Sequence, residues 1–147
     1  MPRFLHTADW QIGRQYASFA PDDAVALAEA RISVIERIAG LATEETVDAV
    51  LVAGDVFDAQ TVSDRTIRRL FNAMAAYTGP WILISGNHDA ALAESVWTRA
   101  QRLEAVPANA HLALTPEVME FGDAGFAILP APLTQRHTMS DLTEWFD

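Results

Sequence analysis

Three short apolar runs, each followed by a polar segment, constrain the fold of this chain more than any other feature. The runs are Phe4–Leu5, Ala49–Ala53 and Trp81–Ile84, and the polar segments are Thr7–Gln11, Gly54–Asp58 and Gly86–Asp89. Open α/β sheets collect ligand groups at the carboxyl ends of their strands. We therefore expect Asp9, Asp55 and Asn87 to converge on one spot. Their oxygens suit Mn²⁺ or Mg²⁺, and a carboxylate can bridge two ions. The pattern predicts a metal-dependent phosphoester hydrolase.

The bulk composition is that of one soluble domain. The chain has 147 residues, of which half are hydrophobic, and it has no cysteine. A disulfide framework, a thiol nucleophile and a thiolate metal site are thereby excluded. The first residues do not form a signal peptide, and no apolar segment approaches the roughly 20 residues of a membrane span. We expect a cytoplasmic protein with no membrane association.

The charge balance limits how the chain could bind nucleic acid. Its net charge is −10, whereas a broad electrostatic grip on nucleic acid requires a basic surface. Bound metal ions would neutralise part of this acidity. All ten basic residues are arginines. Arginine suits bidentate contacts to phosphate, but a genome-wide compositional bias would give the same count, and the sequence leaves both explanations open.

Helical periodicity follows each of the three strands. A first helix opens at Pro21, with an apolar face at Val25, Ala28, Ile32, Ile35, Ala39 and Ala42. Ser63 or Asp64 caps a second helix, whose apolar face carries Ile67, Leu70, Phe71 and Met74. A third helix is expected over about residues 95–103. Strand, helix, strand, helix, strand, helix is the order typical of an α/β layered structure.

The last third of the chain changes pattern. Residues 111–114, 118–121 and 126–129 predict short strands, and the last two resemble a hairpin. These strands predict a mixed sheet. Residues 141–147 resemble the opening of a further helix that is cut short, which indicates a fragment of a longer protein.

The three polar segments, taken together and in this order, resemble the calcineurin-like metallophosphoesterase family. That family has Asp-x-His after the first strand, Gly-Asp-x-x-Asp after the second and Gly-Asn-His-Asp or Glu after the third. The strings at 6–10, 52–58 and 84–89 are most similar to the SbcD-type DNA repair exonuclease branch. The resemblance implies an α-β-β-α sandwich with mixed sheets. Residues 1–147 would be the N-terminal part of a single nuclease domain, with the C-terminal part missing.

The resemblance also implies roles for individual residues. Asp9 would bind a first metal ion, Asp55 would bridge two ions, and Asn87 would bind the second. His88 would be the catalytic histidine, and Asp58 and Asp89 would orient the ligands and His88. The implied cofactor is a pair of divalent ions, Mn²⁺ in preference to Mg²⁺, and the implied reaction is hydrolysis of phosphodiester bonds in DNA.

Two departures from the family pattern affect the expected metal site. Gln11 stands where the family has a histidine ligand, so it is either a weaker oxygen ligand or lies outside the metal shell. The two later histidine motifs are absent, because the chain has only His6, His88, His111 and His137. His137 is either a substitute ligand or a solvated loop residue. The absence of the later histidine ligands predicts an incomplete metal site and is compatible with an inactive chain.

The sequence also suggests binding partners and two alternative functions. Trp10 and Arg14 could contact nucleic acid, by stacking and by a phosphate contact, but Trp10 could equally brace its loop. The resemblance implies an SMC-like coiled-coil ATPase partner and is compatible with a homodimer. One alternative is a phosphodiesterase or pyrophosphatase acting on small nucleotides. Another is a non-catalytic fragment that acts as a scaffold.

Overall fold

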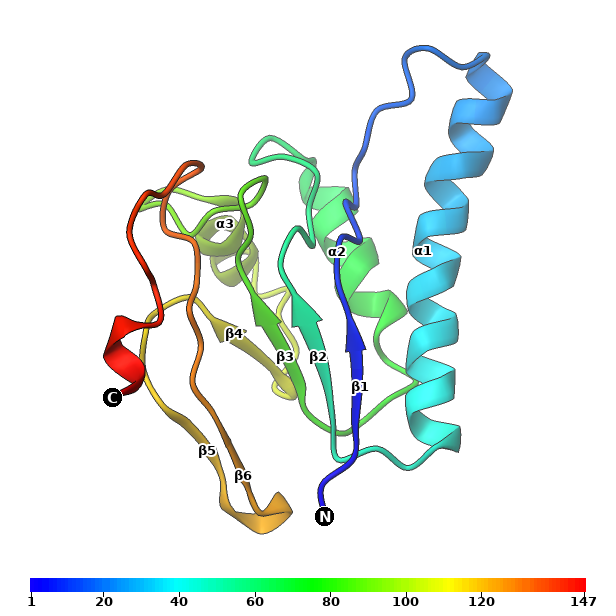
Figure 1. Cartoon of the computed structure of the whole chain (residues 1–147). Coiled ribbons are helices and arrows are strands. Elements are labelled where there is room, and N and C mark those ends of the chain that lie inside the picture. Colours follow the sequence, from blue (N-terminus) through cyan, green and yellow to red (C-terminus); the bar gives the residue numbers. More distant parts are fainter.

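A four-stranded parallel sheet forms the centre of the computed structural model, which describes all 147 residues (Figure 1). Its strands, in spatial order, are β1 (Phe4–Thr7), β2 (Ala49–Ala53), β3 (Trp81–Ile84) and β4 (Ala110–Ala113). Each strand pairs in parallel with the next one along the chain. The carboxyl ends therefore lie on one edge of the sheet, as the apolar runs predicted.

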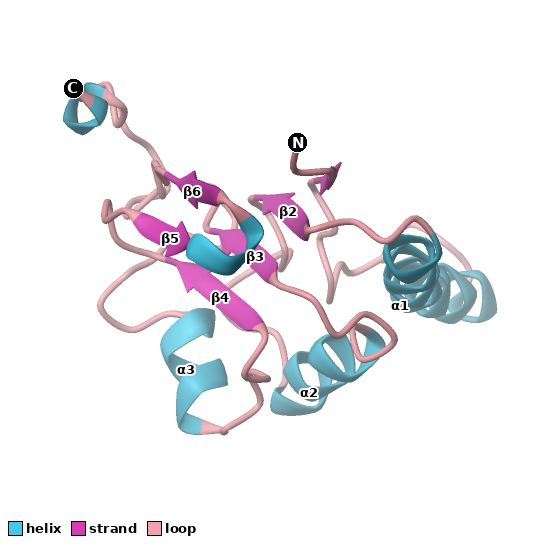
Figure 2. Cartoon of the chain, turned by 90° about the horizontal axis from the view of Figure 1, so that it is seen from below, coloured by secondary structure: helices cyan, strands magenta, loops and turns pink.

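Three helices cover one face of this sheet (Figure 2). They are α1 (Pro21–Glu44), α2 (Asp64–Ala73) and α3 (Val96–Arg102). Ser63 caps α2, because its hydroxyl accepts a hydrogen bond from the Thr66 backbone N–H at 3.1 Å, and Asp64 is the first residue of the helix. None of the helices has the length and apolar character needed to span a membrane.

Only the second half of α1 packs on the sheet. Ile35, Ala39 and Ala42 are buried, whereas Val25 is 62% exposed and Ala28 is also exposed. The apolar face predicted for α1 is therefore buried only in its later turns. The physical reason is geometric: α1 extends beyond the carboxyl edge of the short strands, so its first turns have no sheet to cover (Figure 1).

A separate hairpin lies on the opposite face of the sheet (Figure 2). Its strands, β5 (Met119–Phe121) and β6 (Phe126–Ile128), pair antiparallel, and the rings of Phe121 and Phe126 stack with centroids 4.8 Å apart. The expected α/β class and hairpin are confirmed. The strands do not form one mixed sheet, however, because the parallel and antiparallel pairings belong to two sheets. The residues described form three layers: helices, parallel sheet and hairpin.

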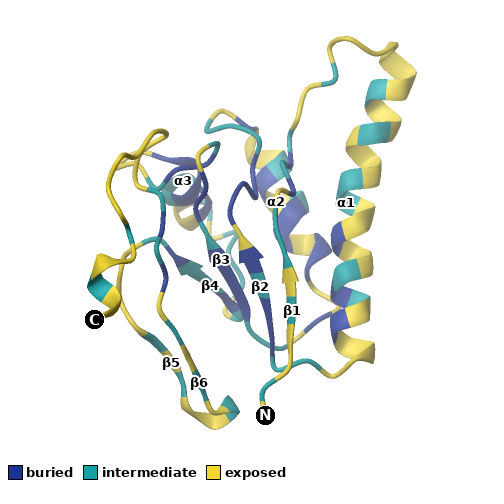
Figure 3. Cartoon of the chain, viewed as in Figure 1, coloured by how far each residue is buried: buried dark blue, intermediate teal, exposed yellow.

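Most buried residues belong to one cluster that joins the helices to the parallel sheet, and the burial colours follow these elements (Figure 3). The largest fully buried ones include Trp81, Trp97 and Phe57. Short 3₁₀ turns occur at η1 (Gly122–Ala124) and η2 (Glu144–Phe146). The helix expected to open at residue 141 is limited to the single turn η2. This buried cluster holds the helices against the strands whose carboxyl ends carry the candidate site.

Candidate functional site

The loops that follow β1 and β2 run side by side beyond the ends of their strands. The backbone N–H groups of Asp9 and Gln11 donate to the carbonyl oxygens of Gly54 and Asp55, at 3.1 and 2.9 Å. Asp9, Gln11 and Asp55 all have positive φ, at 55°, 44° and 49°. Such conformations cost free energy in residues other than glycine and cluster at functional sites. The sequence-predicted ligand positions therefore occupy a tightly constrained part of the backbone.

The loop after β3 approaches Asp55 so closely that a side chain at Gly86 has no room. A Cβ atom at Gly86 would lie 2.1 Å from Asp55 Oδ1 and 2.5 Å from the Asp55 backbone nitrogen. The same Oδ1 accepts a hydrogen bond from the His88 backbone N–H at 3.0 Å. Glycine at position 86 thus lets the polar segment after β2 (Gly54–Asp58, the second motif) come into direct contact with the one after β3 (Gly86–Asp89, the third motif).

The Asp89 side chain contacts the same two loops. Its Oδ1 accepts from the Gly86 N–H at 2.7 Å, and its Oδ2 accepts from the N–H groups of Val56 and Phe57 at 2.8 and 3.1 Å. The indole of Trp97 donates to the Asp89 carbonyl oxygen at 2.6 Å. The Asp89 carboxylate therefore connects the second motif to the third through three backbone hydrogen bonds.

The position of Asp89 also alters its acidity. Asp89 is fully buried, and burial raises the pKa of its carboxyl from 3.8 to about 6. The three backbone N–H groups act in the opposite direction, and the nearby charge of Asp55 adds to the increase in pKa. The carboxylate form is thus held by hydrogen bonds that only partly offset its loss of hydration.

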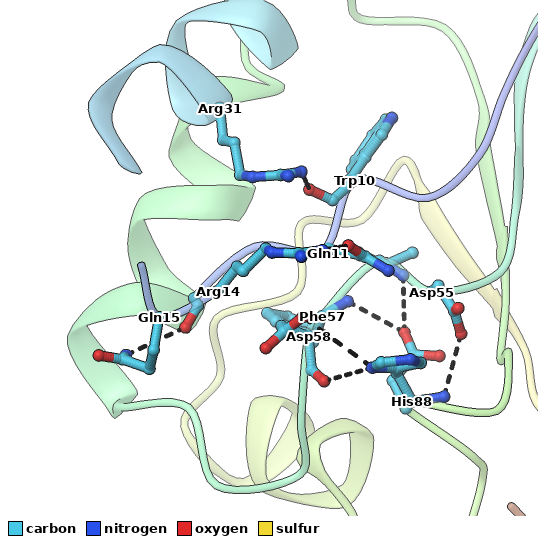
Figure 4. Close-up of polar contacts among 12 residues, drawn as sticks. Trp10, Gln11, Arg14, Gln15, Arg31, Asp55, Phe57, Asp58 and His88 are labelled. Carbon is cyan, nitrogen blue, oxygen red and sulfur yellow. Dashed lines mark hydrogen bonds and ion pairs between the residues drawn. The ribbon is translucent and has the colours of Figure 1, made fainter. Parts of the chain in front are cut away.

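His88 presents one ring nitrogen for chemistry. Its Nδ1 lies 2.8 Å from the carbonyl oxygen of Asp58, which can only accept, so Nδ1 carries a hydrogen and Nε2 remains available (Figure 4). The Asp58 carboxylate lies 3.9 Å from the same Nδ1. Asp58 thereby orients the His88 ring through its backbone as well as its charge. Sequence reasoning had assigned an orienting role to the residue without identifying the backbone contact.

An open hollow of about 550 Å³ adjoins His88 and Asn87. Asp58, Asn87 and His88 line it together with Gln60, Thr61 and Arg136. Asn87 is exposed, and none of the hydrogen bonds of the structure engages its amide. Asp9 is exposed as well, but it lines a different, smaller hollow of about 190 Å³ beside α1. The predicted ligands thus share one edge of the sheet without all opening into one pocket.

The oxygen donors that are present fit a hard divalent cation. Asp55 uses Oδ1 for the His88 N–H, which leaves Oδ2 without a protein partner. Carboxylate and amide oxygens are the ligands that Mn²⁺ and Mg²⁺ prefer. The structure contains no group of three or more His, Cys, Asp or Glu side chains arranged to hold a metal ion. Of the metal ligands predicted from the sequence, Asp9, Asp55 and Asn87 are the residues that have oxygen atoms available for an ion.

Gln11 and Trp10 take structural positions within the first loop. Gln11 Oε1 accepts a hydrogen bond from the Arg14 guanidinium at 2.6 Å, which favours the interpretation that Gln11 lies outside the metal shell (Figure 4). Trp10 is only 5% exposed, and its indole donates to Thr7 Oγ1 at 2.9 Å. Its ring packs edge-on against Trp81. The burial of Trp10 favours the bracing alternative over stacking on a nucleic-acid base.

Sequence reasoning missed a contact that fixes the first loop. Arg31, on α1, donates to the Trp10 carbonyl oxygen at 2.8 Å and to the Tyr16 hydroxyl. No local signal identifies this pairing, because the partners are 21 and 15 residues away. His137 is exposed and makes no hydrogen bond, which agrees with a solvated loop residue.

Comparison with known proteins identifies relatives of the chain. The model of the calcineurin-like phosphoesterase family matches residues 2–135. The SbcD component of the SbcCD nuclease from Rhodobacter capsulatus is 39% identical over 108 residues, which cover 70% of this chain and 23% of the relative. The corresponding protein from Bacillus subtilis is 29% identical over 91 residues, and that from Escherichia coli K12 is 33% identical over 90. These matches cover 59% of this chain and 22% and 21% of the relatives. The chain spans less than a quarter of the length of each.

Proposed function

This chain belongs to the calcineurin-like phosphoesterase family, and we propose that it forms part of a metal-dependent centre that hydrolyses phosphodiester bonds in DNA. One observation carries the proposal. Asp55, the expected shared ligand, contacts the Gly86 backbone and accepts a hydrogen bond from the N–H of His88, the expected catalytic residue. The ligand and the catalytic group are therefore held in a fixed relation before any substrate arrives.

Asp9, Asp55 and Asn87 are the residues that would hold the divalent ions. Two Mn²⁺ ions are proposed, with Mg²⁺ as the second choice, and Asp55 is proposed as the carboxylate that both ions share. When bound, such ions bind phosphoryl oxygens and activate water for an in-line displacement. The positive φ of Asp9 and Asp55 and the glycine at position 86 are the features of this chain that support a fixed backbone at the proposed ligand positions.

His88 is the residue proposed to contact the phosphate of the substrate. The Asp58 carbonyl oxygen accepts from Nδ1–H, so the ring cannot rotate freely, and in the imidazolium form the Nε2–H group is the one that can donate to a phosphoryl or leaving-group oxygen. Asp89 acts through the loops, since its carboxylate holds the backbone on both sides of the site. His88 is thus the proposed catalytic residue, and Asp58 and Asp89 are positioning residues.

The DNA substrate is supported by the names of the relatives, which describe part of a nuclease. A role in DNA repair and an SMC-like coiled-coil ATPase partner are proposed on the family resemblance, and so is a homodimer. The net charge of −10 favours a second candidate, a phosphodiesterase or pyrophosphatase that acts on small nucleotides. Such a substrate needs no extended basic surface.

A substrate comparison with Mn²⁺ tests the proposal. The protein is incubated with linear DNA, with bis(p-nitrophenyl) phosphate and with a small nucleotide, and the Asp55→Asn variant is compared with Asp123→Asn in the exposed η1 turn. We expect Mn²⁺-dependent release of nucleotides from DNA that Asp55→Asn abolishes and Asp123→Asn retains. Hydrolysis of the small nucleotide alone would support the second candidate. A folded protein that hydrolyses none of the three would contradict both proposals and favour the non-catalytic alternative.

A further inference from the structure

A segment that follows β6 returns to the carboxyl edge of the sheet and lies along the third motif (orange to red in Figure 1). Leu133 anchors it at both ends of that motif. Its carbonyl oxygen accepts from Ser85 Oγ and from the Ala91 N–H, each at 2.8 Å, and its N–H donates to the Ser85 carbonyl oxygen at 3.3 Å. The segment is therefore fastened across the loop that carries Asn87 and His88.

The approach to this anchor is rigid. Pro130 and Pro132 are both buried, and each proline ring fixes its own φ near −65°. Arg136 follows Leu133 by three residues and lines the same hollow as Asn87 and His88. Arg136 thus follows closely on a stiff segment that Leu133 fastens beside the site.

Arg136 is the one arginine without a protein partner that lines the hollow beside His88. Six of the ten arginines make hydrogen bonds or ion pairs with protein groups, namely Arg3, Arg14, Arg31, Arg69, Arg99 and Arg102. Of the remaining four, Arg37 lies on α1, Arg65 and Arg68 lie on α2, and Arg136 alone lines the hollow beside His88. A guanidinium whose donors are all free, placed beside a phosphoester site in an acidic protein, is suited to a phosphate.

We propose that Arg136 binds a phosphate of the polynucleotide next to the phosphate that is hydrolysed. This inference rests on the proposed function, because it assigns a subsite to the same substrate. The phosphate would enter the hollow that Arg136 and His88 line together with Thr61. Arg136 would thereby compensate locally for the acidic surface and hold the strand in line with His88.

Binding without catalysis provides the first test. Anisotropy of a fluorescent single-stranded oligonucleotide is measured in EDTA at several salt concentrations for the wild-type protein, Arg136→Ala, Arg136→Lys and the matched control Arg37→Ala. We expect Arg136→Ala to weaken binding about 10-fold, in keeping with one lost charge-assisted hydrogen bond. The slope of log K against log salt should fall by about 0.7, the value for one phosphate contact to a single strand. Arg136→Lys should keep the slope, and Arg37→Ala should match wild type.

Catalysis provides the second test. Arg136→Ala should raise the KM for the oligonucleotide by a larger factor than the KM for bis(p-nitrophenyl) phosphate, which has no neighbouring phosphate. Equal affinity and equal salt slope for Arg136→Ala and Arg37→Ala would overturn the inference, and so would equal losses on the two substrates. If the wild-type protein hydrolyses neither substrate, the proposed function fails, while the binding measurement in EDTA still decides the role of Arg136.

Discussion

Replacement of Gly86 by alanine should separate the second motif from the third. The added methyl group would lie 2.5 Å from the Asp55 backbone nitrogen and 2.1 Å from Asp55 Oδ1, against the 3.4 Å at which ordinary contact begins. Rotation of the Asp55 side chain could relieve the second clash, but it would break the hydrogen bond from the His88 N–H. The first clash involves backbone and can be relieved only if the loop itself moves by about 0.9 Å.

The expected cost follows from these contacts. Overpacking of a well-packed site costs about 1–3 kcal/mol. Loss of a hydrogen bond to a carboxylate adds about 1.5–3 kcal/mol where it is not regained elsewhere. We therefore expect Gly86→Ala to lower the free energy of unfolding by at least about 1 kcal/mol and to weaken Mn²⁺ binding, because Asp55 is displaced in every relaxed arrangement.

Urea unfolding followed by circular dichroism measures the stability, and calorimetric titration measures Mn²⁺ binding. Gly40→Ala is the matched control, because a Cβ at Gly40 on α1 meets nothing within 4 Å. That variant should gain about 0.5–1 kcal/mol, the helical preference of alanine over glycine. A Gly86→Ala protein that unfolds at the wild-type urea midpoint and binds Mn²⁺ normally would refute the close contact between Asp55 and position 86.

Four further predictions concern the site. Because burial raises the folded-state pKa of Asp89 from 3.8 to about 6, the metal-free protein should lose about 2 kcal/mol of stability as pH rises from 4 to 7. Urea midpoints across this range measure the loss, and an equal slope in Asp89→Asn would contradict the assignment. Asp55→Asn should reduce Mn²⁺ affinity more than Asp9→Asn, since a shared carboxylate offsets repulsion between two cations; equal losses in calorimetric titration would count against bridging. His88→Asn should keep its metal content by elemental analysis while turnover falls about 10²–10⁴-fold; loss of metal from this variant would show that His88 is a ligand. Gln11→His should raise Mn²⁺ affinity in calorimetric titration if a histidine there displaces the Arg14 contact.

The strand ends were predictable from sequence because each apolar run stops at a polar segment. Ala49–Ala53 forms β2 with the predicted bounds, and Asp55 and His88 meet as the order of the strands implied. The burial along α1 was not predictable, since periodicity tells which face is apolar and not how far the sheet beneath it extends. The mixed sheet was a wrong inference for a similar reason, because strand patterns do not reveal which sheet a hairpin joins.

Side-chain roles within the loops were harder to predict than the loops themselves. Trp10 has the residue type of a base-stacking group, and its burial depends on Trp81, which is 71 positions away. Gln11 has an oxygen that could bind a metal ion, and the structure assigns that oxygen to Arg14. Such roles are settled by tertiary neighbours that compete for the same atoms, which a single sequence does not display.

The carboxylate of Asp89 makes the opening of the site a single event. The backbone amides of Val56, Phe57 and Gly86 belong to two loops, yet all three donate to this one side chain. When the carboxylate leaves, all three amides lose their acceptor at the same moment and become able to exchange with deuterium. The three amides should accordingly exchange as one cooperative unit, with one opening free energy, even though 29 residues separate Phe57 from Gly86 in the chain.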